Sequence, residues 1–327
     1  MPCNEGQAMQ ASMVDKKEKG NWKWFGPAIA LAFAVWVLLP IAFDILSRML
    51  YHSPEKNIFL LPWSPPAEKE IPAPAIQGPE PDINYKIDLG NGVAIDMVAI
   101  PSGTFTIGSP ESEPKRAFDT YESPQAKVNV DEFWIGRYEI TRAQYEAVMG
   151  YDPERDSRFF GPHEGIAHPE RSVSWTGAMS FCAKLSEMTG QTYTLPTEAQ
   201  WEYACRAGTT TAYYFGNDAS LLDEYAWFKN HPNPHIHEVG QKKPNDWGLY
   251  DMIGNVWEWC LSLFRVYPYS ETDGRNDLTD KQGKRVLRGG SIYEEAIASR
   301  SASRTLDAPG YPRSDGGFRI VRNNQTQ

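Results

Sequence analysis

The stretch Gly248–Trp259, with the sequence GLYDMIGNVWEW, decides how this chain is expected to fold. It carries two carboxylates, Asp251 and Glu258, around a Gly-Asn turn. Such a turn can point carboxylate and main-chain oxygens at one centre, which suits a hard cation such as Ca²⁺. The alternative is an ordinary turn with solvated carboxylates. We favour the calcium site.

Upstream of this stretch, short strands and short helices alternate. The apolar–polar alternation of VAIDMVAIPSGTFTIGS (93–109) predicts two strands joined in a hairpin by the Pro-Ser-Gly turn, and AKVNVDEFWIGRYEIT (126–141) predicts a further strand. Three helices are expected from their start and stop signals: RAQYEAVM between Thr141 and Gly150, the segment from Ser172 to Gly190, and the segment after Thr197, with Gln200 three positions on.

Seven motifs, in order, resemble the formylglycine-generating enzyme, or sulfatase-modifying factor, family over about Tyr85–Arg322. They are PSGTFTIGS, VDEFWIGRYEITRAQY, SVSWTGAMSFCAKLS, LPTEAQWEYACRAGT, NDWGLYDMIGNVWEWC, RVLRGGS and the ending RSASR…GGFRIVR. The resemblance implies an α+β, C-type-lectin-like fold with little regular structure. Because the family also includes relatives with other roles, it does not by itself fix a reaction.

In that family the GLYDMIGNVWEW segment binds structural calcium. The resemblance implies side-chain oxygens from Asp251 and Glu258 and main-chain oxygens from Gly254 and Val256. The family's second calcium site uses an asparagine where this chain has Trp227, so we do not expect that site here.

The RVLRGGS motif (285–291) marks the expected binding groove. Its paired glycines allow close approach of a ligand or another strand. The resemblance implies that Trp257 and Ser291 line this site, and that two cysteines after the serine bind copper and activate oxygen. Here Glu294 falls at the first cysteine position, and Ala298 or Ser299 falls at the second.

No cysteine follows Cys260 in this chain. Because soft thiolates suit Cu(I), we expect no copper and no formylglycine generation. An arginine nearby could grip a carboxylate or peptide carbonyls, or pair internally, as we expect of Arg304 and Arg319. The candidate groove therefore consists of Trp257, Ser291, Glu294, Ser299 and Arg300.

The remaining cysteines and histidines allow several interpretations. The four cysteines match no zinc pattern. Cys182, Cys205 and Cys260 are expected to be buried, although an oxidising compartment would allow a Cys182–Cys205 disulfide. The cluster HPNPHIH offers a weak metal candidate, with a surface loop as the favoured alternative; its histidines are His231, His235 and His237.

Composition limits the class of protein. The chain has 327 residues, 13% of them aromatic, with 26 Gly and 25 Pro. This predicts an ordered domain with many turns and few long helices. The net charge of −10 argues against nucleic acid as a partner, because phosphate binding needs a basic face.

The N-terminal region predicts a membrane anchor. Trp24–Phe43 runs for 20 residues without a charged side chain, enough to span a bilayer as a helix. The alternatives are a buried soluble helix and a cleaved signal peptide, but no small-x-small cleavage site follows. Lysines precede the span more often than basic residues follow it, which places the N-terminus inside; the residues counted are Lys16, Lys17, Lys19 and Lys23 against Arg48 and Lys56.

These features divide the chain into four parts. Residues 1–23 are expected to be a cytoplasmic tail, and 24–46 a single-pass signal anchor in the inner or plasma membrane. Residues 53–84, rich in proline, predict a semi-rigid polyproline spacer or a plain disordered linker. The family-like domain, 85–323, is expected in the periplasm or outside the cell.

Three functions follow as hypotheses. The first is a non-catalytic domain that binds a protein or peptide and serves assembly or maturation at the membrane. The second is a metal-dependent oxidase of an exported protein or peptide, with Glu294 or Glu295 and a histidine as ligands. The third, ranked last, is formylglycine generation by another route.

Overall fold

The computed structural model describes residues 85–113, 116, 121–151, 165–230 and 234–323. The expected tail, membrane anchor and spacer (1–23, 24–46 and 53–84) lie outside these ranges. Within them, no helix is both long enough and apolar enough to cross a bilayer.

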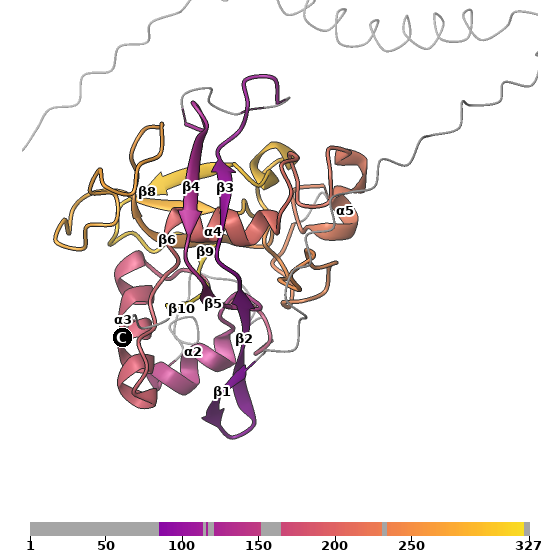
Figure 1. Cartoon of the computed structure of the whole chain (residues 1–327). Coiled ribbons are helices and arrows are strands. Elements are labelled where there is room, and N and C mark those ends of the chain that lie inside the picture. The colour runs from indigo at the N-terminus through magenta and orange to yellow at the C-terminus, as the bar shows by residue number, and fades with distance from the viewer. Residues whose placement is uncertain (1–84, 114–115, 117–120, 152–164, 231–233, 324–327) are drawn as a thin grey trace, which may run out of the picture. The chain divides into compact units, whose positions relative to one another are not determined.

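Two four-stranded sheets and one strand pair form the domain (Figure 1). The first sheet has the order β1 (Tyr85–Gly90), β2 (Val93–Ile100), β5 (Phe133–Gly136), β10 (Val321–Asn323), and all its pairs are antiparallel. The second has the order β8 (Arg304–Asp307), β7 (Arg285–Arg288), β6 (Trp257–Leu263), β9 (Gly316–Gly317), with β6 and β9 parallel. The separate pair joins β3 (Gly103–Ile107) to β4 (Ala126–Val130).

The predicted hairpin over 93–109 is wrong in its pairing. Both strands form, but β2 is hydrogen-bonded to β1 on one edge and to β5 on the other. Both edges of β2 are therefore occupied. After Pro101 and Ser102 the chain enters β3, which pairs with β4 instead. The single strand expected over 126–141 is likewise two strands, β4 and β5, in different sheets.

The helices follow their local signals. α2 (Arg142–Met149) and α4 (Glu198–Arg206) begin at Thr141 and Thr197, as predicted; the predicted capping box at Thr197 is complete, and Thr141 forms one as well. α3 (Trp175–Thr189) is capped by Ser174 and ends at the left-handed Gly190. Shorter helical segments are η1 (Ala219–Leu221), α5 (Leu222–Tyr225) and η2 (Ala296–Ser299).

α4 is buried on nearly every side, although it carries charges. Glu198 and Glu202 are both fully buried. Glu202 pairs with Arg206 at 2.9 Å and with Arg288, and Glu198 pairs with Arg304 at 2.6 Å. Buried charges persist only when they are paired, so this network ties α4 to β7 and β8.

Strand β6 brings the GLYDMIGNVWEW segment into the middle of the fold. All seven of its residues are buried. Trp259 donates its indole N–H to Val173 O at 2.8 Å, and Trp175 donates to Cys260 O at 3.0 Å.

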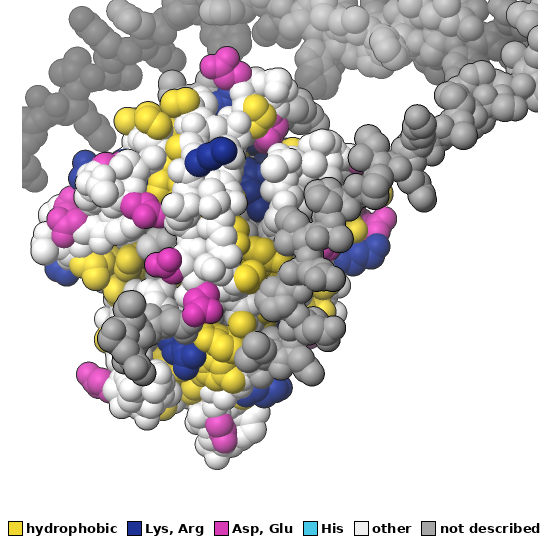
Figure 2. All heavy atoms as spheres, in the orientation of Figure 1, with side chains coloured by type: hydrophobic (Ala, Val, Ile, Leu, Met, Phe, Trp, Pro, Cys, Tyr) yellow, Lys and Arg dark blue, Asp and Glu magenta, His cyan; other side chains and the backbone are white. Residues whose placement is uncertain are grey.

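On the face shown in Figure 2, acidic and basic side chains are dispersed among hydrophobic and uncharged ones.

Candidate functional site

The turn that precedes β6 has an unusual backbone. Asp251, Gly254 and Asn255 all have positive φ values, of 53°, 84° and 56°. A Cβ on Gly254 would lie 2.3 Å from the carbonyl oxygen of Trp227, so only glycine allows the two segments to approach this closely. The turn is therefore held in one shape by its own sequence and by the Trp227 segment.

Three buried carboxylates surround this turn. Glu139 and Glu258 are fully buried, and Asp251 is almost so. Burial, followed by the charges of Asp251 and Glu258, raises the pKa of Glu139 well above its usual range. Burial also raises the pKa of Asp251 to about 6. Both shifts show that burial disfavours the charged form of these two acids.

Arg319 supplies part of the compensating charge. Its Nε and Nη2 donate to Glu258 Oε2 and Oε1, both at 2.6 Å, and Trp201 donates to Oε2 at 2.7 Å. Asp251 Oδ2 accepts from the Gly240 amide at 2.6 Å, but its Oδ1 is buried without a hydrogen-bond partner. A buried, unpaired carboxylate oxygen is costly, and a cation at this atom would remove that cost.

Two of the predicted calcium donors have spare capacity to accept. Asp251 Oδ1 is unsatisfied, and the bond from Arg319 uses only one of the two lone pairs of Glu258 Oε1. The carbonyls of Gly254 and Val256 belong to the same turn. Oxygen donors of this kind suit Ca²⁺ rather than a soft metal. The calcium site remains a prediction.

Three of the candidate groove residues lie together. Trp257 donates its indole N–H to Glu294 Oε1 at 3.4 Å. Ser291 is fully buried and donates to Asp315 Oδ2 at 2.7 Å. Arg313 joins the two halves: its Nε pairs with Asp315 at 2.7 Å and its Nη2 reaches Glu294 at 3.5 Å. We call Trp257, Ser291, Glu294, Arg313 and Asp315 the Glu294 surface.

The glycine pair after β7 shapes the segment beside this surface. A Cβ on Gly290 would lie 2.8 Å from Ala298 O and 3.3 Å from Ser299 N, so the chain packs directly against η2. Ser299 is fully buried at the end of η2, and its hydroxyl finds no hydrogen-bond partner within the described ranges. Of the two positions expected for the second cysteine, Ala298 and Ser299, the latter is therefore an enclosed serine.

Arg300 does not belong with the Glu294 surface. Its guanidinium is 1% exposed and pairs with Glu122 at 2.6 Å and Glu113 at 2.5 Å. Both acids follow β3, so Arg300 anchors the β3–β4 connection rather than facing a partner. The prediction that Arg300 belongs to the groove, where it could grip a carboxylate or peptide carbonyls, is therefore wrong.

The described histidines of the cluster, His235 and His237, lie beside the indole ring of Trp227. His231 lies outside the described residues. The His237 ring stacks on Trp227 with centroids 3.5 Å apart, and His235 lies 4.3 Å from His237. Lys242 Nζ lies 3.8 Å from the centroid of the Trp227 ring. In the part of the chain that the structure covers, no group of three or more His, Cys, Asp or Glu residues is arranged to hold a metal ion.

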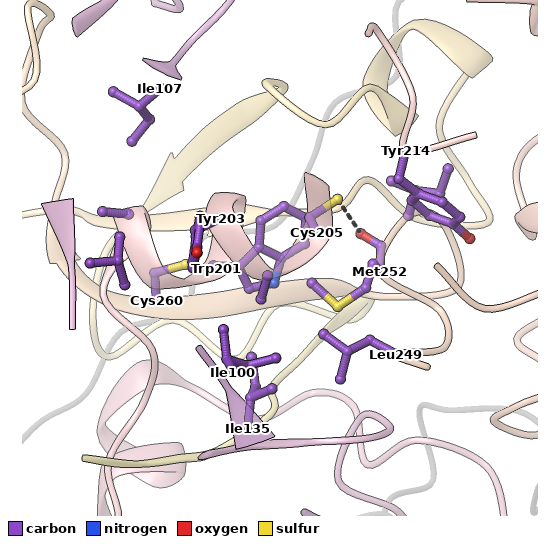
Figure 3. Packing of buried hydrophobic residues seen from close by; sticks show 14 of the residues in the cluster. Ile100, Ile107, Ile135, Trp201, Tyr203, Cys205, Tyr214, Leu249, Met252 and Cys260 are labelled. Carbon is purple, nitrogen blue, oxygen red and sulfur yellow. Dashed lines mark hydrogen bonds between the residues drawn. The ribbon is translucent and has the colours of Figure 1, made fainter. Parts of the chain in front are cut away.

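The described cysteines are all buried free thiols, so the Cys182–Cys205 disulfide does not form. Burial raises the pKa of Cys205 to about 12, and that of Cys182 and Cys260 also rises above the usual thiol value. Figure 3 shows Cys205 and Cys260 within the packed core, where the Cys205 thiol donates to Met252 O at 3.9 Å. None of the three supplies a reactive thiolate.

Three residues of the site were missed from the sequence: Glu139, Arg313 and Asp315. Glu139 lies in the RYEIT motif and contacts the turn across more than 100 positions of chain. Arg313 and Asp315 precede the GGFR motif, and their polar-charged run beside paired glycines was the available signal.

Comparison with known proteins agrees with the observed fold. The model of the sulfatase-modifying factor enzyme 1-like domain matches residues 91–324. The formylglycine-generating enzyme of Mus musculus is 28% identical, with 69% of this chain and 74% of that protein covered. The inactive C-alpha-formylglycine-generating enzyme 2 of Bos taurus is 27% identical, with 72% and 90% covered.

Two solved structures share the fold over their whole length. PvdO from Pseudomonas aeruginosa is 28% identical with a TM-score of 0.64, covering 75% of this chain and 100% of that one. The Treponema denticola variable protein 1 is 27% identical with a TM-score of 0.64, covering 73% and 99%. Since the matched model covers most of the chain, this protein belongs to the sulfatase-modifying factor enzyme 1-like family.

Proposed function

We propose that this domain binds a protein or peptide without oxidising it, as an assembly or maturation subunit held outside the cytoplasm by a single-pass anchor. The observation that carries the proposal is the chemical nature of Glu294 and the contacts of its side chain. Where catalytic relatives are expected to have a copper-binding cysteine, this chain has a carboxylate that Trp257 and Arg313 contact at 3.4 and 3.5 Å. Glu294 is thus engaged in a hydrogen-bonded surface of hard oxygen and nitrogen groups.

The other half of the expected thiolate pair is also lost. Ser299 is enclosed, and the three described thiols are buried with raised pKa values. Two adjacent thiolates are the ligands that Cu(I) requires in this chemistry, and no residue in the site replaces their softness. This supports binding over oxidation.

The surroundings of Glu294 supply what a binding surface needs. Tyr293, next to Glu294 in the chain, is 41% exposed, and Tyr311, two positions before Arg313, is 56% exposed; tyrosine is enriched where proteins meet. Trp257 and Ser291 are buried and donate hydrogen bonds to Glu294 and Asp315. The dispersed charges in Figure 2 and the net charge of −10 support a protein rather than a nucleic acid as the partner.

We also propose structural calcium at Asp251, Gly254, Val256 and Glu258, supported by the unpaired Asp251 Oδ1. The anchor and the extracytoplasmic location are proposals as well, supported by the uncharged stretch Trp24–Phe43 and by the lysines that precede it.

Two measurements test the proposed function. The full-length protein, purified in detergent, is incubated with copper, oxygen and a cysteine-containing sulfatase peptide, with the Mus musculus enzyme as the positive control. We expect the peptide mass to stay unchanged; conversion of its cysteine to the aldehyde overturns the proposal.

The second measurement looks for the partner. A photo-crosslinking amino acid replaces Tyr293 in cells, and in a control strain it replaces Met188, which is 50% exposed on α3. We expect one discrete crosslinked protein from position 293 that is absent from position 188. Equal patterns from the two positions argue against a binding role for the Glu294 surface.

A further inference from the structure

Glu139 is a fully buried carboxylate that follows β5 and supports the turn before β6. Its Oε2 accepts a hydrogen bond from Asn255 Nδ2 at 2.7 Å, and its Oε1 accepts from the Val256 amide at 3.3 Å. Both contacts are to the turn itself. Because a carboxylate accepts up to four hydrogen bonds, one side chain can fix two successive residues of the turn.

Asn255 also forms hydrogen bonds with three other segments. Its backbone amide donates to Trp227 O at 2.8 Å, its side-chain Oδ1 accepts from the His237 amide at 3.0 Å, and its backbone carbonyl accepts from the Ile292 amide at 2.9 Å. Its backbone has a φ of 56°, a conformation that few residues adopt without such support. Asn255 therefore connects the turn by a hydrogen bond to the segment that begins at Ser291.

Additional contacts join the turn to the Glu294 surface. The Gly254 amide donates to Gly289 O at 2.8 Å, and Val256 packs with Ile292 and Ile236 in one small apolar cluster. Trp257, which belongs to the surface, follows Val256 directly. A change in the position of the turn would therefore move residues on both sides of Ser291.

The hydrogen bonds around the turn favour a cation beside it. Arg319 pairs with Glu258 through two hydrogen bonds, whereas Asp251 accepts from the Gly240 amide through Oδ2 and leaves its buried Oδ1 without a partner. A divalent cation at Asp251 Oδ1 would satisfy that oxygen.

We propose that Glu139 is a positioning residue for the calcium turn, and that it couples calcium binding to the order of the Ser291–Glu294 segment. It holds Asn255 and Val256 so that the oxygens of the turn face one ion, and Asn255 in turn holds Ile292. This inference rests on the proposed calcium site.

The affinity of the full-length protein for calcium is the first test. Chelator-treated protein is titrated with calcium chloride in a calorimeter as wild type, as Glu139→Gln, and as Glu132→Gln, which removes an exposed carboxylate from the turn between β4 and β5. Loss of a residue that orients metal ligands weakens binding about 10- to 100-fold. We expect this change for E139Q, and wild-type affinity for E132Q.

Hydrogen exchange of the wild-type protein is the second test, and it does not depend on a variant that folds. Calcium is expected to protect the amides of Val256 and Ile292 together, seen in peptides covering 251–258 and 289–294. Equal calcium affinities of E139Q and wild type, or protection of 251–258 alone, overturns the role of Glu139. If the wild type binds no calcium, the calcium site itself fails, while the crosslinking and peptide-oxidation results still decide the proposed function.

Discussion

Arg319 and Glu258 form a bidentate ion pair in the interior of the domain. The two hydrogen bonds are both 2.6 Å long, and neither side chain is more than 1% exposed. The remaining donors of Arg319 reach the carbonyls of Gly136 and Tyr250 at 3.1 and 3.0 Å. This pair therefore joins β6 to the end of β5 and to the start of the turn that precedes β6.

Because Glu258 pairs with Arg319, substitutions of the two candidate calcium carboxylates, Glu258 and Asp251, should affect stability differently. Glu258→Gln leaves Arg319 buried without its charged partner, so we expect a loss of about 3–5 kcal/mol in the free energy of unfolding even in chelator, and a larger loss in calcium. Asp251→Asn removes the charge but keeps an oxygen that can accept from the Gly240 amide, so it should lower the thermal midpoint in excess calcium and have a small effect in chelator. Urea and thermal unfolding in both conditions check this. Equal losses for D251N in calcium and in chelator contradict the calcium site.

The pH dependence of stability should report the Glu202 network. Burial works to raise the pKa of Glu202, but Arg288 and Arg206 outweigh it, so the pKa is lowered. A lowered folded-state pKa contributes stability above the unfolded value of about 4.3, and that contribution is lost as pH falls through the folded value. We expect Glu202→Gln to be less stable than wild type at pH 7 by about 3 kcal/mol and to lose less stability on acidification.

Urea unfolding from pH 7 to pH 3 measures this difference. Glu132→Gln, on an exposed turn, should keep the wild-type pH profile. A wild-type profile for E202Q would mean that the buried carboxylate does not change its pKa on folding.

Local signals predicted local structure well. Thr141, Thr197 and Gly190 mark helix ends because each cap bonds to residues within one turn. Strand pairing was mispredicted for 93–109, since it depends on β1 and β5 competing for the edges of β2. The residues of the site behave in the same way. Trp257, Ser291 and Glu294 were found through motifs, but their partner Arg313 was not.

The charged partners were hidden for a physical reason. Arg300 lies one position after Ser299, yet its carboxylate partners are 178 and 187 positions away. Nothing in the local pattern distinguishes such an arginine from one that faces a ligand. Glu139 was likewise invisible, because its buried state depends on the turn that it contacts more than 100 positions later.

The Glu294 surface should contribute little to stability. Glu294 is 38% exposed, and its contacts to Trp257 and Arg313 are 3.4 and 3.5 Å long. Exposed pairs of this kind are worth about 0–1 kcal/mol. Glu294→Ala is therefore expected to unfold within about 1 kcal/mol of wild type in urea while losing the crosslinked partner detected from position 293. Retention of the same crosslink at wild-type yield would show that the carboxylate plays no part in binding.

Gly290→Ala should separate close packing from backbone strain. Gly290 has a φ of 80°, and an added Cβ would lie 2.8 Å from Ala298 O and 3.0 Å from Ala298 C, so η2 would have to move. Gly274 has a nearly equal φ of 79° and nothing within 4 Å of the added atom, which makes Gly274→Ala a matched control for strain alone. The control is expected to lose about 1–2 kcal/mol from left-handed strain. G290A should lose about 1–3 kcal/mol more, the usual effect of overpacking. Urea unfolding measures both variants, and exchange of the 296–300 amides should rise in G290A alone; equal losses with unchanged exchange would mean that η2 does not depend on this close approach.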